Sequence, residues 1–287
     1  MISRRSFALG AVAGVHLPAP ATAQRKSPPA ASAKPKLPPG RDPGGVAIAI
    51  IGAGVDYTRP EIAARLARDG EGDLIGWDFI DNDNRPFTKD HHPTLLPHVA
   101  AAPAVRLVPL RVSPDTVDAI GQALVFLKRT PARIAIVLDG RVLPQFWKPF
   151  DEFVAEATDL LLIVPSLRAH PRPSLVPDNA VLVTAVPQGR YAMLVARKFN
   201  LSNFDAGPAP QDIDVALTIE TTDAERANGT RERDLAWEDT AAVRLAGLCA
   251  TLIAREPVLA GPALKQRLLA LAKPAPRAAR HGVIEAP

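Results

Sequence analysis

An apolar run at residues 46–51, closed by Gly52 and Gly54, constrains the fold of this 287-residue chain more than any other feature. The run is rich in β-branched side chains and holds no polar residue, which is typical of a fully buried strand in a parallel sheet. The two glycines predict a tight turn at the carboxyl end of that strand. Because ligands and chemistry in open α/β sheets lie at the carboxyl ends of strands, Gly52 marks the first place to look for function.

Strand-like and helix-like patterns alternate along the rest of the chain. Further strands are predicted at residues 73–80, 105–112, 133–138, 160–165, 180–186 and 213–217. Helices are predicted at residues 60–66, 113–128, 146–158, 239–255 and 261–271. This alternation predicts a single α/β domain with a doubly wound, mostly parallel sheet and helices on both faces.

The first 23 residues have the pattern of a twin-arginine export signal. Arg4 and Arg5 precede an apolar run that ends at Leu17, and residues 21–23 form a small-x-small cleavage site. The apolar run is shorter than the roughly 20 residues that a membrane-spanning helix needs. We therefore expect a bacterial protein, periplasmic or secreted, that keeps no transmembrane anchor after signal cleavage.

Composition divides the remaining chain into a linker, a domain and a tail. Residues 24–43 are rich in proline and lack aromatic residues, so they are predicted to form a disordered linker. Residues 44–272 are predicted to form the folded domain, and residues 273–287 a flexible tail.

The positive net charge of +4 belongs to the amino-terminal segment. The first 43 residues carry seven basic residues and one acidic residue, which leaves 27 basic and 29 acidic residues in the rest. The predicted domain is therefore slightly acidic, which argues against a nucleic-acid partner. A single cysteine, Cys249, excludes an intrachain disulfide framework, and its place on an apolar helix face predicts an inert core thiol.

A dinucleotide-binding turn is a first interpretation of Gly52 and Gly54. That fingerprint requires a third glycine three residues after the second, where this chain has Tyr57. Pro60 also interrupts any long helix that would start at the turn. We therefore expect no nucleotide cofactor.

A second interpretation rests on motifs spread over almost the whole predicted domain. Residues 50–62, IIGAGVDYTRPEI, resemble the first motif of the subtilisin-like serine peptidases (subtilases). Further similar segments follow in the family's order, at residues 76–86, 98–100, 134–140, 160–167, 177–186, 202–204, 212–216, 240–252 and 256–269. Each match is weak alone, but their common order and plausible spacing make the resemblance strong. It implies a subtilisin-like fold.

The resemblance also implies which positions would carry serine peptidase chemistry. Such chemistry needs a carboxylate, an imidazole and a nucleophilic hydroxyl, together with a donor for the oxyanion. In this chain the family positions for the triad fall on Gly52, Leu95 and Asp239. The position of the oxyanion asparagine falls on Leu167. None of these four residues can perform the family's role, so the resemblance predicts a pseudo-peptidase.

Neighbouring residues offer substitutes, which keep an active enzyme open as an alternative. His91 and His92 lie three or four residues before Leu95, and Thr240 is the hydroxyl next to Asp239. They would give an active subtilisin-like serine endopeptidase with a shifted catalytic site. One step along a helix turns a side chain by about 100°, which argues against Thr240 as the nucleophile.

Two groups of residues have the chemistry of metal ligands, but a structural role explains each group better. His91, His92 and His98 with Asp239, and Glu238 beside it, have the chemistry of zinc ligands, but adjacent histidines seldom reach one ion. Residues 81–84, DNDN, lack the glycine and the distal glutamate of a calcium loop and fit a polar turn. No metal is therefore expected.

These patterns together favour a catalytically inactive subtilase-like protein. The hypothesis is a retained scaffold that binds a peptide or protein of unknown identity in the bacterial envelope, by addition of a strand to an exposed edge. A purely structural domain of a larger envelope complex remains a third possibility.

Overall fold

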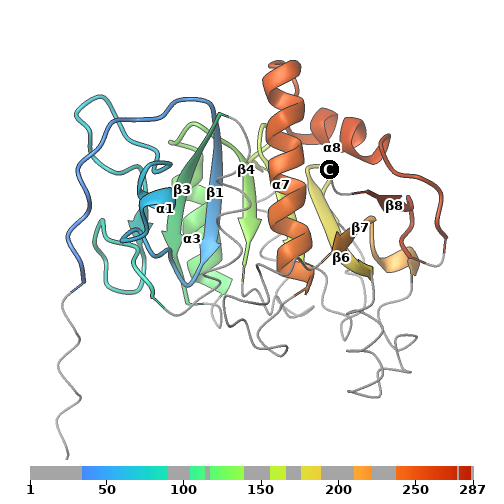
Figure 1. Cartoon of the computed structure of the whole chain (residues 1–287), viewed down its shortest axis with the longest axis horizontal. Helices are drawn as coiled ribbons and strands as arrows, with labels where there is room; N and C mark the ends of the chain where they lie inside the picture. Colours follow the sequence, from blue (N-terminus) through green and yellow to red (C-terminus); the bar gives the residue numbers. More distant parts are fainter. Residues whose placement is uncertain are drawn as a thin grey trace, which may run out of the picture. The chain divides into compact units, whose positions relative to one another are not determined.

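A parallel sheet of eight strands forms the centre of the computed structural model (Figure 1). The structure describes residues 34–89, 104–113, 117–138, 156–165, 176–188, 210–220, 237–276 and 278–285. The strands are β1 (Val46–Gly52), β2 (Trp77–Asp78), β3 (Val105–Arg111), β4 (Ala132–Val137), β5 (Leu161–Pro165), β6 (Ala180–Gln188), β7 (Val215–Glu220) and β8 (Val283–Ile284). Their order is β2-β3-β1-β4-β5-β6-β7-β8, and every pair in it is parallel.

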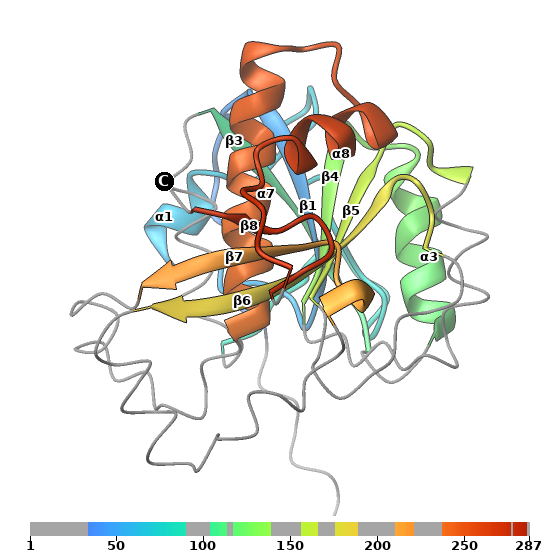
Figure 2. The ribbon, with the colours of Figure 1, turned by 90° about the vertical axis from the view of Figure 1, so that its right-hand side faces the viewer.

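Helices cover both faces of this sheet, as Figure 2 shows with the sheet between α3 and α7. The helices are α1 (Pro60–Ala63), α3 (Val117–Leu127), α7 (Trp237–Arg255) and α8 (Gly261–Leu269), with a short 3₁₀ turn η3 (Pro210–Asp212). One hydrophobic cluster includes residues of α7 and α8, and a second includes residues of α3. The predicted doubly wound α/β class is confirmed.

Strand β1 shows how the sequence builds both layers. Its side chains alternate between the faces, so that Ile48 and Ile50 join the α7 cluster while Ala47 and Ala49 join the α3 cluster. All seven residues of β1 are buried because the strand pairs with β3 on one side and β4 on the other. The continuous apolar run is thus required by burial on both faces.

Several element boundaries differ from those that the sequence predicts. The predicted strand at residues 73–80 shrinks to β2, because the chain folds back after Asp78, whose backbone N–H bonds the Asp83 carbonyl at 2.8 Å. Helix α1 ends at Ala63 instead of residue 66. The helix predicted after a cap at Ser113 is described from Val117 onward, as α3. Strands β6 and β7 continue beyond their predicted ends, to Gln188 and Glu220. Most of the predicted helix 146–158 lies outside the described residues.

Residues 34–43, which we call the strap, differ from the disordered linker predicted over residues 24–43. They have no regular secondary structure, but they lie against the domain and belong to the same compact unit, residues 34–287. Leu37 packs against the α7 cluster, and Asp42 accepts hydrogen bonds from Gly44 and Arg68 backbone N–H groups at 2.7 and 2.8 Å. Composition did not reveal these contacts because their partners lie up to 64 residues away.

The carboxyl-terminal residues also differ from the predicted flexible tail, residues 273–287. Lys273 and Val283 exchange backbone hydrogen bonds of 2.8 and 2.9 Å, and β8 then pairs with β7. Ile284 is only 3% exposed and belongs to the α7 cluster. This segment therefore completes the sheet instead of leaving the domain.

Candidate functional site

The carboxyl edge of the sheet, where β1 ends and α7 begins, is the place that the sequence marked for function. The last turn of α7 lines a cavity together with the amino ends of β1 and β4, so α7 runs antiparallel to the strands. Its first turn therefore lies at the carboxyl edge, the lower edge in Figure 1. Gly52 and the first turn of α7, with Asp239 and Thr240, thus share one edge of the sheet.

Gly52 leaves no room for a side chain at this edge. The Val112 backbone N–H donates to the Gly52 carbonyl at 2.8 Å, and the Leu138 N–H donates to the Ile51 carbonyl at 2.7 Å. A Cβ atom on Gly52 would lie 2.9 Å from the Leu138 carbonyl oxygen and 3.3 Å from the Leu138 Cβ. Such an approach to a backbone oxygen is a few tenths of an ångström too short, so a side chain here would require the backbone to shift. The position that the resemblance gives to a carboxylate is therefore closed by the neighbouring strand end.

Asp239 and Thr240 both lie buried in the first turn of α7. Their exposed fractions are 7% and 5%. A carboxylate suits this position because the amino end of a helix carries partial positive charge. A buried acid there stabilises the helix, but it cannot act as an activated hydroxyl nucleophile.

The remaining predicted site residues lie outside the described residues. These are Leu95 and Leu167 at the family positions, and His91, His92 and His98 as possible substitutes or metal ligands. Of the predicted set, the structure therefore describes only Gly52, Asp239 and Thr240. Within the described part of the chain, no group of three His, Cys, Asp or Glu side chains could hold a metal ion.

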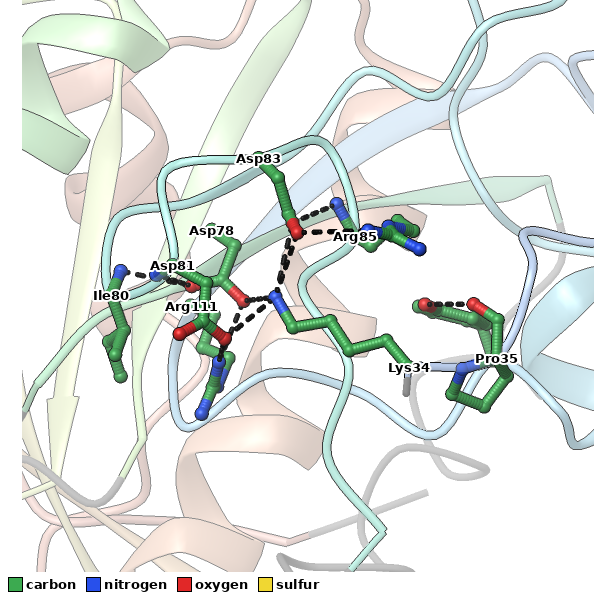
Figure 3. A network of polar contacts seen from close by, with 9 residues as sticks. Lys34, Pro35, Asp78, Ile80, Asp81, Asp83, Arg85 and Arg111 are labelled. Atoms are coloured by element: carbon green, nitrogen blue, oxygen red, sulfur yellow. Dashed lines mark hydrogen bonds and ion pairs between the residues drawn. The ribbon is translucent and has the colours of Figure 1, made fainter. Parts of the chain in front are cut away.

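A second polar site, which the sequence did not predict, surrounds the side chain of Asp78 (Figure 3). This carboxylate is 0% exposed. One oxygen accepts the Lys34 ammonium at 2.6 Å and Arg111 Nη1 at 2.8 Å. The other accepts the backbone N–H groups of Ile80 and Asp81 at 2.9 and 3.0 Å. Four charge-assisted hydrogen bonds compensate for the loss of water around the buried charge.

Lys34 joins this site to the polar turn that follows β2. Its ammonium lies 2.6 Å from Asp78, 2.8 Å from Asp81 and 3.1 Å from Asp83, so its three donors face three carboxylates. Arg111, at the end of β3, bridges Asp78 and Asp81 from the other side. Asp78, Asp81 and Asp83 thus form a carboxylate cluster that is neutralised by cations of this chain.

The charges in the cluster shift the pKa values of its members. Burial opposes the charge on Lys34, but hydrogen bonds to the three carboxylates outweigh it and raise the pKa of the ammonium. Hydrogen bonds from Lys34 and Arg111 lower the pKa of Asp81. Burial acts to raise the pKa of Asp83, but the Arg85 backbone N–H and Lys34 lower it below its usual value.

The signal for this cluster was present in the sequence but divided between two segments. The DNDN sequence predicts a polar turn, and Lys34 falls in the predicted linker. Only the fold shows that these segments meet, because 44 residues separate Lys34 from Asp78.

Cys249 lies on α7 and is fully buried. Burial raises the pKa of its thiol far above the usual value, which keeps the sulfur protonated and unreactive. This environment agrees with the predicted inert core thiol.

Comparison with solved structures finds several proteins of similar fold. A cold-adapted subtilisin-like serine proteinase shares 15% identity over 88% of this chain and 92% of its own, with a TM-score of 0.56. MycP1 from Mycobacterium smegmatis shares 16% identity over 85% of this chain and 78% of its own, with a TM-score of 0.51. A chain of the periplasmic assembly from the ESX-5 inner membrane complex shares 15% identity over 85% and 78%, with a TM-score of 0.54.

At this level of identity the similarity concerns the fold alone. The sequence matches no protein-family model and no curated protein. The chain therefore has the subtilisin-like fold that its motifs predict.

Proposed function

We propose that this chain with a subtilisin-like fold is a catalytically inactive peptidase homologue that binds a peptide or protein partner, or serves as a scaffold, in the bacterial envelope. The observation that carries the proposal is the closure of Gly52. The Leu138 carbonyl would lie 2.9 Å from any Cβ at this position. A carboxylate that orients an imidazole therefore has neither an atom nor a space here.

The other substitutions act in the same direction. Asp239, which falls on the family position of the nucleophile, carries a carboxyl group where a peptidase would need a hydroxyl. Leu95 and Leu167 add neither a base nor an oxyanion donor. Because triad and oxyanion groups act as a unit, the loss of all four removes the reaction instead of slowing it modestly.

Binding remains chemically possible at the carboxyl edge. The outermost strands of the sheet, β2 and β8, have two residues each, so an added strand would gain few backbone hydrogen bonds at either side. We therefore expect a peptide to bind across the strand ends, near Gly52 and the first turn of α7, instead of extending the sheet.

The proposed place of action rests on the amino-terminal signal. Residues 1–23 have the twin-arginine export pattern, which leads to the periplasm or beyond. No helix among the described residues is long and apolar enough to cross a bilayer. A neighbour of similar fold belongs to a periplasmic assembly, which supports the idea of a protein partner in the envelope.

The test combines hydrolysis and binding on the purified mature chain. We expect no cleavage of casein or of fluorogenic peptides, and saturable binding of members of a peptide library. Failure to bind any peptide or partner would contradict the binding role. Hydrolysis that is lost on Thr240→Ala, or on replacement of His91 and His92, would instead establish the alternative of an active serine endopeptidase with a shifted site.

A further inference from the structure

The strap has the sequence of a polyproline II ligand. Residues 34–39 read KPKLPP, with prolines at positions 35, 38 and 39. Proline holds φ near −65° and disfavours the helical region for the residue before it, so the sequence favours an extended stretch with about three residues per turn. A polyproline II backbone makes no internal hydrogen bonds, which leaves its carbonyl groups available to a partner.

Burial along the strap follows this threefold period. Lys34, Pro35, Leu37 and Pro38 are half-buried, whereas Lys36 and Pro39 are exposed. One face of the strap is therefore pressed against the domain and the other faces solvent. This is the burial expected of a proline-rich ligand in its recognition groove.

The domain surface under the strap supplies matching donors. The Tyr57 hydroxyl donates to the Pro35 carbonyl at 3.0 Å, and Arg68 Nη2 donates to the Pro38 carbonyl at 2.5 Å. Tyr57 is fully buried and packs at 59° against Phe87, with ring centroids 5.0 Å apart. The Phe87 ring thus packs against the aromatic donor where it meets the strap.

The carboxylate cluster recognises the residue before the first proline. Lys34 places its ammonium within 2.6–3.1 Å of Asp78, Asp81 and Asp83. Its side chain is 15% exposed, and Asp78 is fully buried. The ammonium of Lys34 is therefore enclosed by three carboxylates.

We propose that the surface of Tyr57, Arg68 and the Asp78–Asp81–Asp83 cluster recognises a proline-rich segment with a lysine directly before its first proline. The chain fills this surface with its own strap, and a segment of the same chemistry in a partner protein competes for it. The inference goes beyond the proposed function, because it concerns a different surface and does not depend on whether the chain cleaves peptides.

The strap is covalently linked to the domain, and this link determines how competition by a partner segment must be tested. A short tether gives the strap an effective concentration of the order of millimolar, so a free ligand competes poorly while the strap stays attached. The exposed residues Pro39, Gly40 and Arg41 allow the tether to be cut. The test therefore inserts a site-specific protease sequence between Gly40 and Arg41 of the full chain and compares the protein before and after cleavage.

The probe is a fluorescent acetylated peptide with the sequence of residues 34–40, KPKLPPG, followed by anisotropy. We expect saturable binding to the cleaved chain, and binding weaker by about tenfold or more to the uncut chain. A peptide with glutamate in place of its first lysine should bind about tenfold more weakly, and rising salt should weaken binding of the original.

Matched variants of the cleaved chain locate the site. Asp81→Asn removes a carboxylate that contacts Lys34 at 2.8 Å, and Tyr57→Phe removes the donor to Pro35. Each should weaken the peptide severalfold. Glu71→Gln changes an exposed carboxylate outside the site and should leave binding unchanged.

Four outcomes would overturn the proposal. The first is no saturable binding up to about the millimolar effective concentration of the tether, with the unfolding midpoint unchanged. The second is equal affinity for the glutamate peptide. The third is unfolding of the cleaved chain, which would make the strap part of the fold instead of a ligand. The fourth is a concentration-dependent dimer of the uncut chain that the peptide dissociates, since the occupant would then be a second copy.

Discussion

Position 52 lacks both the carboxylate of the family motif and the space for one. The Leu138 carbonyl oxygen lies 2.9 Å from the place where a Cβ atom of residue 52 would be, which is too close for a side chain unless the backbone shifts. Reintroducing the carboxylate alone would require the backbone after β4 to move. The proposed loss of catalysis would therefore depend on the packing around Gly52 as well as on the residue itself.

Gly52→Asp should destabilise the fold and should not create activity. Because the new Cβ would meet a backbone oxygen at 2.9 Å, we expect a loss of about 1–3 kcal/mol in the free energy of unfolding. Urea denaturation measures it. Gly70→Asp is the matched control, because a Cβ there has nothing within 4 Å, and it should change stability by less than about 0.5 kcal/mol. Equal stability of the two variants would show that the edge at Gly52 is not closed.

At the scale of elements, the strap is held by charge at both ends. Lys34 binds the carboxylate cluster, and Asp42 pairs with Arg106 at 2.9 Å. Burial acts to raise the pKa of Asp42, but hydrogen bonds from the Arg68 and Gly44 backbone N–H groups and from Arg106 lower it. A segment without regular secondary structure is thus fixed by the ionisation of a few side chains.

Docking of the strap should be independent of pH over the neutral range and weaken at both extremes. The lowered pKa values of Asp42, Asp81 and Asp83 give stability that is present above their usual value of 3.8 and is lost as pH falls below it. The raised pKa of Lys34 gives stability that is present below 10.5 and is lost as pH rises above it.

The anisotropy of a dye attached to the Lys36→Cys variant reports this docking. Position 36 is exposed and accepts the dye, whereas the buried Cys249 should not react with it. We expect a plateau from about pH 5 to 9 and a decrease on either side, at pH values where circular dichroism still shows the fold. Lys34→Met should lower the plateau and remove the alkaline decrease. A transition near neutral pH would contradict the assigned charges.

At the scale of the whole molecule, the sequence predicted the strands that a local apolar pattern determines, but not the segments that depend on distant contacts. The apolar runs of β1, of β5 and of residues 134–137 in β4 identified buried strands, because burial on both faces leaves no polar position in them. The strap and β8 were missed for a common reason. Lys34 and Ile284 are held by residues distant in sequence, and no local pattern in a proline-rich segment indicates such partners.

For the candidate site, too, the sequence predicted positions within single elements but not contacts between elements. The motifs placed Gly52 and Asp239 at strand and helix ends, which the structure bears out. They could not show that the Leu138 carbonyl closes the space at Gly52, because that contact joins two strands. Nor could they show that Lys34 neutralises the polar turn after β2.

Ile284→Ala tests whether the carboxyl terminus is part of the fold. Ile284 is 3% exposed within the α7 cluster, so we expect a loss of about 2–5 kcal/mol in the free energy of unfolding. Leu271→Ala is the control for an exposed leucine, since Leu271 is 38% exposed, and it should change stability by less than about 1 kcal/mol. Similar effects of the two substitutions in urea denaturation would instead support the tail as a flexible segment.

The most direct test of the central claim is labelling of the mature chain with a fluorophosphonate probe, which reacts with activated serine and threonine hydroxyls. The closed position at Gly52 and the acid at Asp239 predict no labelling, under conditions in which an active subtilisin is fully labelled. Stoichiometric labelling that mass spectrometry maps to Thr240 or another hydroxyl, and that is lost when His91 and His92 are replaced by alanine, would contradict the account.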